Sequence, residues 1–83
     1  MISVKIEECN TKAAMSVKPD KKIKLDLEKI KKRFKVLIDT PILLVIDEQG
    51  EIIVHSYGEL LFKTLRDEEK IRKIAEEIYR CTL

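Results

Sequence analysis

The sequence has little of what most catalytic and cofactor-binding sites are built from. Its 83 residues include no tryptophan, two glycines, one histidine (His55) and two cysteines, Cys9 and Cys81. No Gly-rich phosphate loop, calcium loop or C-x-x-C pair is present. The cysteines leave three alternatives: reduced thiols, a disulfide, or a metal site with His55 that lacks a fourth ligand. We therefore expect no cofactor and no bound metal.

Long hydrophobic segments are also absent. The longest apolar run, "PILLVI", is far shorter than the roughly 20 residues that a membrane helix needs. The opening "MISVKIEE" lacks the basic and apolar regions of a secretory signal. These absences predict a cytoplasmic protein without membrane contact.

The residues that are present describe one folded unit with an uneven charge. Hydrophobic residues make up 45% and charged residues 39%, which is typical of a single soluble domain over residues 1–83. The richness in Ile, Lys and Glu resembles the bias of thermophile proteins. Residues 18–35 hold nine basic and three acidic residues, a surplus of six charges in a chain whose net charge is +2. Such a cluster can attract nucleic acid; its candidate contacts are Lys21, Lys22, Lys24, Lys31, Lys32, Arg33 and Lys35.

The periodicity of apolar residues predicts the order β-β-α-β-β-β-α. Strands are expected over residues 2–7, 12–17, 42–47, 51–56 and 59–65. One helix follows Asp26, its predicted N-cap, with the apolar stripe Leu27, Ile30 and Phe34. The second begins near Asp67, with the stripe Ile71, Ile74, Ala75 and Ile78. Between them, "KVLIDTP" can add a short extended piece, and Pro41 excludes Thr40 from a helix. The pattern predicts an α+β domain, an antiparallel sheet with two helices packed on one face.

The stretch "IIVHSYGELLFKTL" can close as a hairpin in two registers. A two-residue loop pairs polar with apolar residues across the strands. A three-residue loop, Ser56–Tyr57–Gly58, matches them, with Gly58 as the left-handed residue. The pairs are then Val54–Leu60, Ile52–Phe62, Ile53–Leu61, His55–Glu59 and Glu51–Lys63.

This register assigns side chains to the two faces of the sheet. Ile42, Leu44 and Ile46 are expected on the helix-covered face. The open face receives Leu43, Val45, Ile53 and Leu61, with Asp47, Glu51, His55, Glu59 and Lys63 around them. Asp47 opposite Glu51 is an unfavourable like-charge pair. Small monomers seldom leave four aliphatic side chains exposed together, so we expect this face to be a contact surface.

Residues 13–81 resemble one repeat of the TATA-box-binding protein fold. The stretches "AAMSVKPDKKIKLDLEKI", "ILLVIDEQGEIIVHSYGELLFKTL" and "RDEEKIRKIAEEIYR" carry this resemblance. It implies a half-domain of a fold that occurs as two tandem repeats, so a single repeat would pair with a second copy. The family binds the DNA minor groove with aromatic wedges and basic side chains. Here His55 stands where a wedge phenylalanine is expected and Glu59 where a lysine is usual, which argues against DNA bending.

Three functions follow from these features. The first is a non-enzymatic protein-interaction module that forms a homodimer, or serves as an adaptor, through the open face; its contact residues are Leu43, Val45, Ile53, His55, Leu61 and Lys63. The alternative is a nucleic-acid-binding protein that uses residues 18–35. Catalysis by His55 as a base, oriented by Glu59, is the third, and the pattern places no nucleophile beside that pair. We expect no enzymatic activity.

Overall fold

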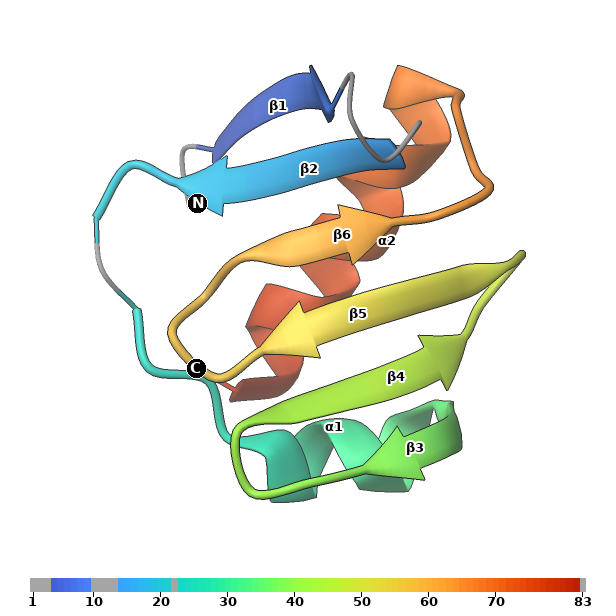
Figure 1. Cartoon of the computed structure of the whole chain (residues 1–83). Helices are drawn as coiled ribbons and strands as arrows, with labels where there is room; N and C mark the ends of the chain where they lie inside the picture. The colour runs from blue at the N-terminus through green and yellow to red at the C-terminus, as the bar shows by residue number, and fades with distance from the viewer. Residues whose placement is uncertain (1–3, 10–13, 22, 83) are drawn as a thin grey trace.

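The computed structural model describes residues 4–9, 14–21 and 23–82. In them one antiparallel sheet has the strand order β1-β2-β6-β5-β4-β3, and two helices accompany it (Figure 1). The predicted α+β class is confirmed. The elements along the chain are β1 (Val4–Cys9), β2 (Ala14–Pro19), α1 (Leu27–Arg33), β3 (Lys35–Asp39), β4 (Leu43–Asp47), β5 (Glu51–His55), β6 (Leu60–Phe62) and α2 (Glu68–Thr82).

The order contains one strand more than predicted. β3 pairs with β4 at the edge of the sheet, and its register shifts between Val36 and Ile38, so Leu37 is an extra, bulged residue. A bulge breaks the alternation of apolar and polar residues by which a strand is detected in sequence. β6 is also shorter than predicted, while β1 and β2 continue past the ends predicted for them, to Cys9 and Pro19. The predicted connection between β1 and β2 lies largely in residues 10–13, outside the described residues.

The predicted hairpin register is correct. Ile52 pairs with Phe62, Ile53 with Leu61 and Val54 with Leu60. These pairs follow from a turn of three residues, 56–58, in which Gly58 has a φ of 112°. The cross-strand pairs Asp47–Glu51 and Ile46–Ile52 are likewise as expected.

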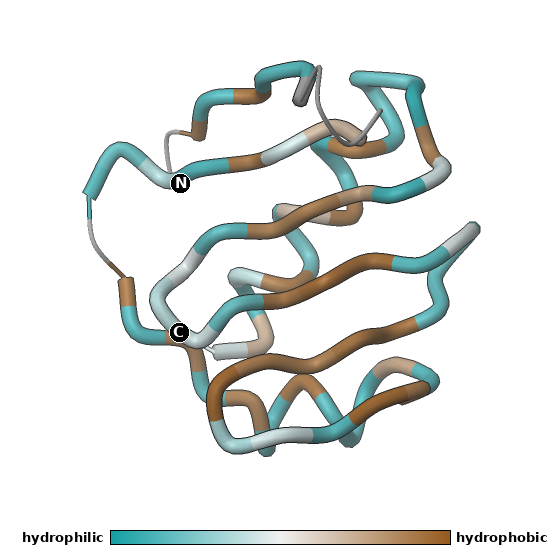
Figure 2. The backbone as a smooth tube through the Cα atoms, in the orientation of Figure 1, coloured by the Kyte–Doolittle hydropathy of each residue, from teal (hydrophilic) through white to brown (hydrophobic). Residues whose placement is uncertain are grey.

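Both helices cover the same face of the sheet (Figure 1). Ile30 of α1 and Ile71, Ile74 and Ile78 of α2 pack into one core with the inward side chains of the strands. Apolar residues follow the central strands and polar residues the loops (Figure 2). The fully buried inward residues are Val17, Leu44, Ile46, Ile52, Val54, Leu60 and Phe62. Ile42 was wrongly expected among them: it precedes β4 and is 68% exposed, because Pro41 and Thr40 end the strand alternation there.

Caps define where the helices begin. The Asp26 side chain accepts a hydrogen bond from the Glu28 backbone N–H at 3.1 Å, as an N-cap does. Asp67 accepts in the same way from the N–H groups of Glu69 and Lys70. The short residue Asp therefore sets the start of each helix where the sequence predicted it.

The β5–β6 turn is held from the helix side. The Tyr79 hydroxyl of α2 donates a 2.7 Å hydrogen bond to the Gly58 carbonyl, and Tyr79 is 1% exposed. The Leu25 N–H donates to the Ser56 carbonyl at 2.8 Å. A Cβ on Gly58 would lie 2.9 Å from the Ile23 carbonyl oxygen. The turn thus has one conformation, specified by glycine and by two contacts to other parts of the chain.

Candidate functional site

The face of the sheet opposite the helices, the open face, is crossed by a row of aligned side chains. Cross-strand pairing aligns Ser16 with Leu61, Leu61 with Ile53, Ile53 with Val45 and Val45 with Ile38. We call these five residues the central row. Four of them are aliphatic, and they come from four adjacent strands, β6, β5, β4 and β3. The sequence predicted three of the four; Ile38 was missed because β3 was not recognised as a strand.

The central row is more shielded in its middle than predicted. Val45 is 7% exposed and Leu61 9%, and each lies between two cross-strand neighbours of the same face. Ile53 and Leu43 are partly exposed. Ile38, at the edge, is 53% exposed. The accessible part of the row is therefore concentrated at its β3 end; Leu37, the bulged residue, and Ile42, which precedes β4, are also exposed but lie outside the row.

Charged residues lie on one side of the central row. The Lys63 ammonium is 3.4 Å from the Glu51 carboxylate, as the register predicted. Asp47 does lie opposite Glu51, but its other cross-strand neighbour is Lys35. The Asp47 carboxylate also accepts the Gly50 N–H at 3.3 Å. Two lysines thus flank the two acids, which offsets their mutual repulsion.

On the other side of the central row, His55, Tyr57 and Glu59 form a cluster. The rings of His55 and Tyr57 stack with centroids 5.1 Å apart and an interplanar angle of 21°. The Tyr57 hydroxyl donates to the Glu59 carboxylate at 3.2 Å. Burial and the nearby negative charge of Glu59 raise the pKa of Tyr57 above its usual value.

This cluster differs from the arrangement that the sequence indicated. His55 and Glu59 are joined through the backbone, N–H to carbonyl at 2.9 Å, while the Glu59 carboxylate receives the hydroxyl of Tyr57. The sequence assigns Tyr57 only to the loop, because spacing cannot show that its ring folds back onto His55. With Ser16, Lys18, Glu7 and their neighbours, the cluster lines a shallow hollow of about 480 Å³. The Ser16 hydroxyl in this hollow donates to the Glu7 carbonyl.

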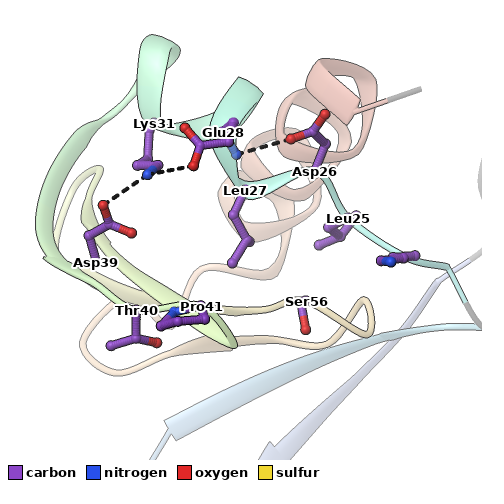
Figure 3. A pocket seen from close by; sticks show the side chains of 10 residues that line it. Leu25, Asp26, Leu27, Glu28, Lys31, Asp39, Thr40, Pro41 and Ser56 are labelled. Atoms are coloured by element: carbon purple, nitrogen blue, oxygen red, sulfur yellow. Dashed lines mark hydrogen bonds and ion pairs between the residues drawn. The ribbon is translucent and has the colours of Figure 1, made fainter.

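A second hollow, of about 820 Å³, lies between the start of α1 and the β3–β4 loop (Figure 3). The Lys31 ammonium bridges it, 2.9 Å from both the Glu28 and the Asp39 carboxylates. Hydrogen bonds to Asp39 and then Glu28 raise the pKa of Lys31. In the described part of the chain, no buried side-chain nitrogen or oxygen lacks a hydrogen-bond partner.

The basic segment is partly neutralised by its own fold. Lys31 pairs with Glu28 and Asp39, and Arg33 lies 3.4 Å from Glu77 of α2. Of the other candidate contacts, Lys21, Lys24, Lys32 and Lys35 are exposed, and Lys22 lies outside the described residues. The surplus of positive charge in residues 18–35 therefore overstates the charge available to an anionic partner.

The cysteine, possible metal ligands and helices of the described residues were the remaining indications of a functional site. Cys81 is a free, half-buried thiol, and no group of three or more His, Cys, Asp or Glu residues within the described ranges could hold a metal ion. None of the described helices is long and apolar enough to cross a membrane. No family model, no curated protein and no solved structure matches the chain.

Proposed function

We propose that this protein is a small, non-enzymatic interaction module that self-associates through the open face of its sheet. The observation that carries the proposal is the central row: aliphatic side chains from four adjacent strands, aligned by register on the side that neither helix covers. Val45 and Leu61 are already shielded, but Ile53 and Ile38 would lose contact with water when a second surface packs on the row, and that burial favours association.

The resemblance to a TATA-box-binding protein repeat supports the same proposal. Residues 14–82 run strand, helix, antiparallel strands, helix, which is the order that the resemblance implies for one repeat. A fold that occurs as a pair of repeats would gain its second half from another copy of the chain. The extra strand β1, which pairs along β2, is a departure from that pattern.

Sedimentation analysis of the wild type and of Ile53→Lys at high micromolar concentration tests the proposal. Ile53 points away from the helix-side core, so its replacement should leave the fold intact, as circular dichroism and a thermal melt can verify. In a dimer, each substituted side chain would bury its ammonium group without a partner, and we expect the dissociation constant to rise by at least about a hundredfold.

The matched control is Ile42→Lys. It makes the same chemical change at a more exposed position that lies outside the central row, and it should leave association nearly unchanged. A wild type that stays monomeric, or an Ile53→Lys variant that associates like the wild type, would contradict the proposal. Salt-sensitive binding to DNA or RNA by a monomeric wild type would favour the basic segment instead.

A further inference from the structure

Each of the two central strands, β5 and β6, carries an acidic residue on one side of the central row and a histidine or lysine at the same distance on the other side. On β5, Glu51 and His55 lie two residues before and after Ile53. On the neighbouring strand, Lys63 and Glu59 lie two residues after and before Leu61. Backbone hydrogen bonds extend the pairing to both ends, from Lys63 N–H to the Glu51 carbonyl at 3.1 Å and from His55 N–H to the Glu59 carbonyl at 2.9 Å. All four residues therefore keep the register of the hairpin.

This pattern is complementary to itself under one particular rotation. A two-fold axis that runs along the central row, across the strands, places each strand against the same strand of a second copy. Ile53 then meets Ile53 and Leu61 meets Leu61. The polar positions exchange: Glu59 meets the second copy's Lys63, and His55 meets the second copy's Glu51. Because the interface is isologous, each of these pairs occurs twice.

We infer that the partner of the open face is a second copy of this chain, packed face to face about a two-fold axis along the central row. The inference rests on the proposed function and adds its geometry. The Glu59–Lys63 pair between copies is attractive in both of its occurrences, and the His55 imidazole can donate a hydrogen bond to Glu51. The same arrangement thus places aliphatic residues against one another in the centre and complementary polar residues against one another on either side.

Rotating the axis by a right angle is less favourable. An axis that runs along the strands, between β5 and β6, also pairs acids with Lys63 and His55. However, it places Ser16 against Val45 and Leu61 against Ile53, so the aliphatic residues of β4 no longer meet one another. It also places Ile38 opposite Glu7 of β1. Contact between aliphatic residues therefore favours the axis across the strands over the axis along them.

These residues lie in the middle of the sheet, so the twist of the sheets disturbs their pairing between copies least. Packed sheets cross at about 30°, so strands far from the centre of the interface lose their alignment first. With the order β1-β2-β6-β5-β4-β3, β5 and β6 are the two middle strands. On β4, farther out, Leu43 would lie toward the second copy's Asp47. That position is exposed, and its carboxylate already accepts the Gly50 N–H.

A double-mutant cycle on dimer dissociation tests the axis, with Glu59→Lys, Lys63→Glu and the double exchange in the full chain. Within one chain, Glu59 and Lys63 are four residues apart on a strand, about 13 Å. This distance exceeds the screening length of about 8 Å at physiological salt, so coupling between them reports on contacts between copies. The repulsion that Lys63→Glu creates with Glu51 of the same chain is present in monomer and dimer alike, and it cancels from the cycle.

Each single substitution should raise the dimer dissociation constant about tenfold, since two exposed attractive pairs become repulsive. The double exchange should return it to within about threefold of the wild-type value, because it restores both pairs with their signs reversed. Glu68→Lys on α2 and Lys32→Glu on α1 make the same charge changes at exposed positions on the helix side of the sheet, and neither should affect dissociation.

One series of dissociation measurements distinguishes a wrong axis from a wrong proposed function. If Ile53→Lys abolishes the dimer but the effects of the two charge substitutions multiply without rescue, the open face associates about another axis and this inference is wrong. If the wild type is monomeric, or Ile53→Lys has no effect, both the inference and the proposed function fail.

Discussion

Replacing Tyr79 with phenylalanine should destabilise the protein by removing a single buried hydrogen bond. The Tyr79 hydroxyl donates to the Gly58 carbonyl at 2.7 Å, in a position where the residue is 1% exposed and Gly58 is also buried. Phenylalanine fills almost the same volume, so no cavity term is added. The remaining cost is a buried carbonyl without its donor, about 1–2 kcal/mol of unfolding free energy.

For a domain of this length, such a loss lowers the midpoint of thermal unfolding by about 5–15 °C. Differential scanning calorimetry or a urea titration measures it. Tyr57→Phe is the matched control, because it removes the same hydroxyl from a side chain that is 59% exposed and bonds to Glu59 at 3.2 Å. Water replaces that bond, and the cost should stay below about 0.5 kcal/mol. Equal losses in the two variants would refute the assignment of the buried bond as a stabilising contact.

The same residue predicts how stability falls at alkaline pH. Burial, followed by the negative charge of Glu59, raises the pKa of Tyr79 in the folded protein. In the unfolded chain a tyrosine ionises near about pH 10. The native state therefore keeps a proton that the unfolded state loses, and this contribution to stability is complete below about pH 10 and decreases above it. The stability difference between wild type and Tyr79→Phe should therefore shrink as the pH rises above about 10, while contributions from groups that both variants share cancel. A constant difference would contradict the raised pKa.

Three further substitutions test the turn and the helix caps. Gly58→Ala should lower the free energy of unfolding by about 1–3 kcal/mol, because alanine disfavours the left-handed φ of 112° and its Cβ would crowd the Ile23 carbonyl. Unchanged stability in a urea titration would contradict this expectation. Asp26→Ala and Asp67→Ala should each lower the free energy of unfolding by about 1 kcal/mol, because each removes an N-cap. The two losses should add, since the residues cap different helices. An Asp67→Ala variant as stable as the wild type would show that the bonds to Glu69 and Lys70 contribute nothing.

The central strands were predictable from sequence because one physical requirement governs both of their faces. Ile52 and Val54 must face the helices, so Ile53 and His55 must face away, and a slip of one residue would expose the core. The turn was predictable for a related reason, since Gly58 suits a three-residue loop that keeps apolar residues opposite one another. Local alternation and long-range packing agree in these strands, and the prediction was correct.

The parts that sequence did not predict depend on contacts between distant or flexible groups. β3 is an edge strand with a bulge at Leu37, so its pattern carries no regular alternation. Lys31 and Arg33 were counted as free charges, yet they pair with Asp39 and Glu77, eight and 44 residues away. The stacking of Tyr57 on His55 follows from a rotamer and not from spacing. Periodicity therefore predicts which face of the sheet or helix a residue occupies, but not which neighbouring residue its side chain contacts.

The two faces of the sheet are linked through the β5–β6 turn. Gly58 is held from the helix side by Tyr79, and the Ser56 carbonyl accepts the Leu25 N–H. These contacts leave the hairpin one register, and that register sets Glu59 and Lys63 at equal distances from Leu61 on the open face. A hairpin free to slip by one residue would move the polar groups out of their two-fold arrangement and place Phe62 in water. The self-complementarity that we propose for the open face therefore depends on the core on the other side, which fixes the turn. A substitution that loosens the turn should weaken the proposed association without changing the contact surface.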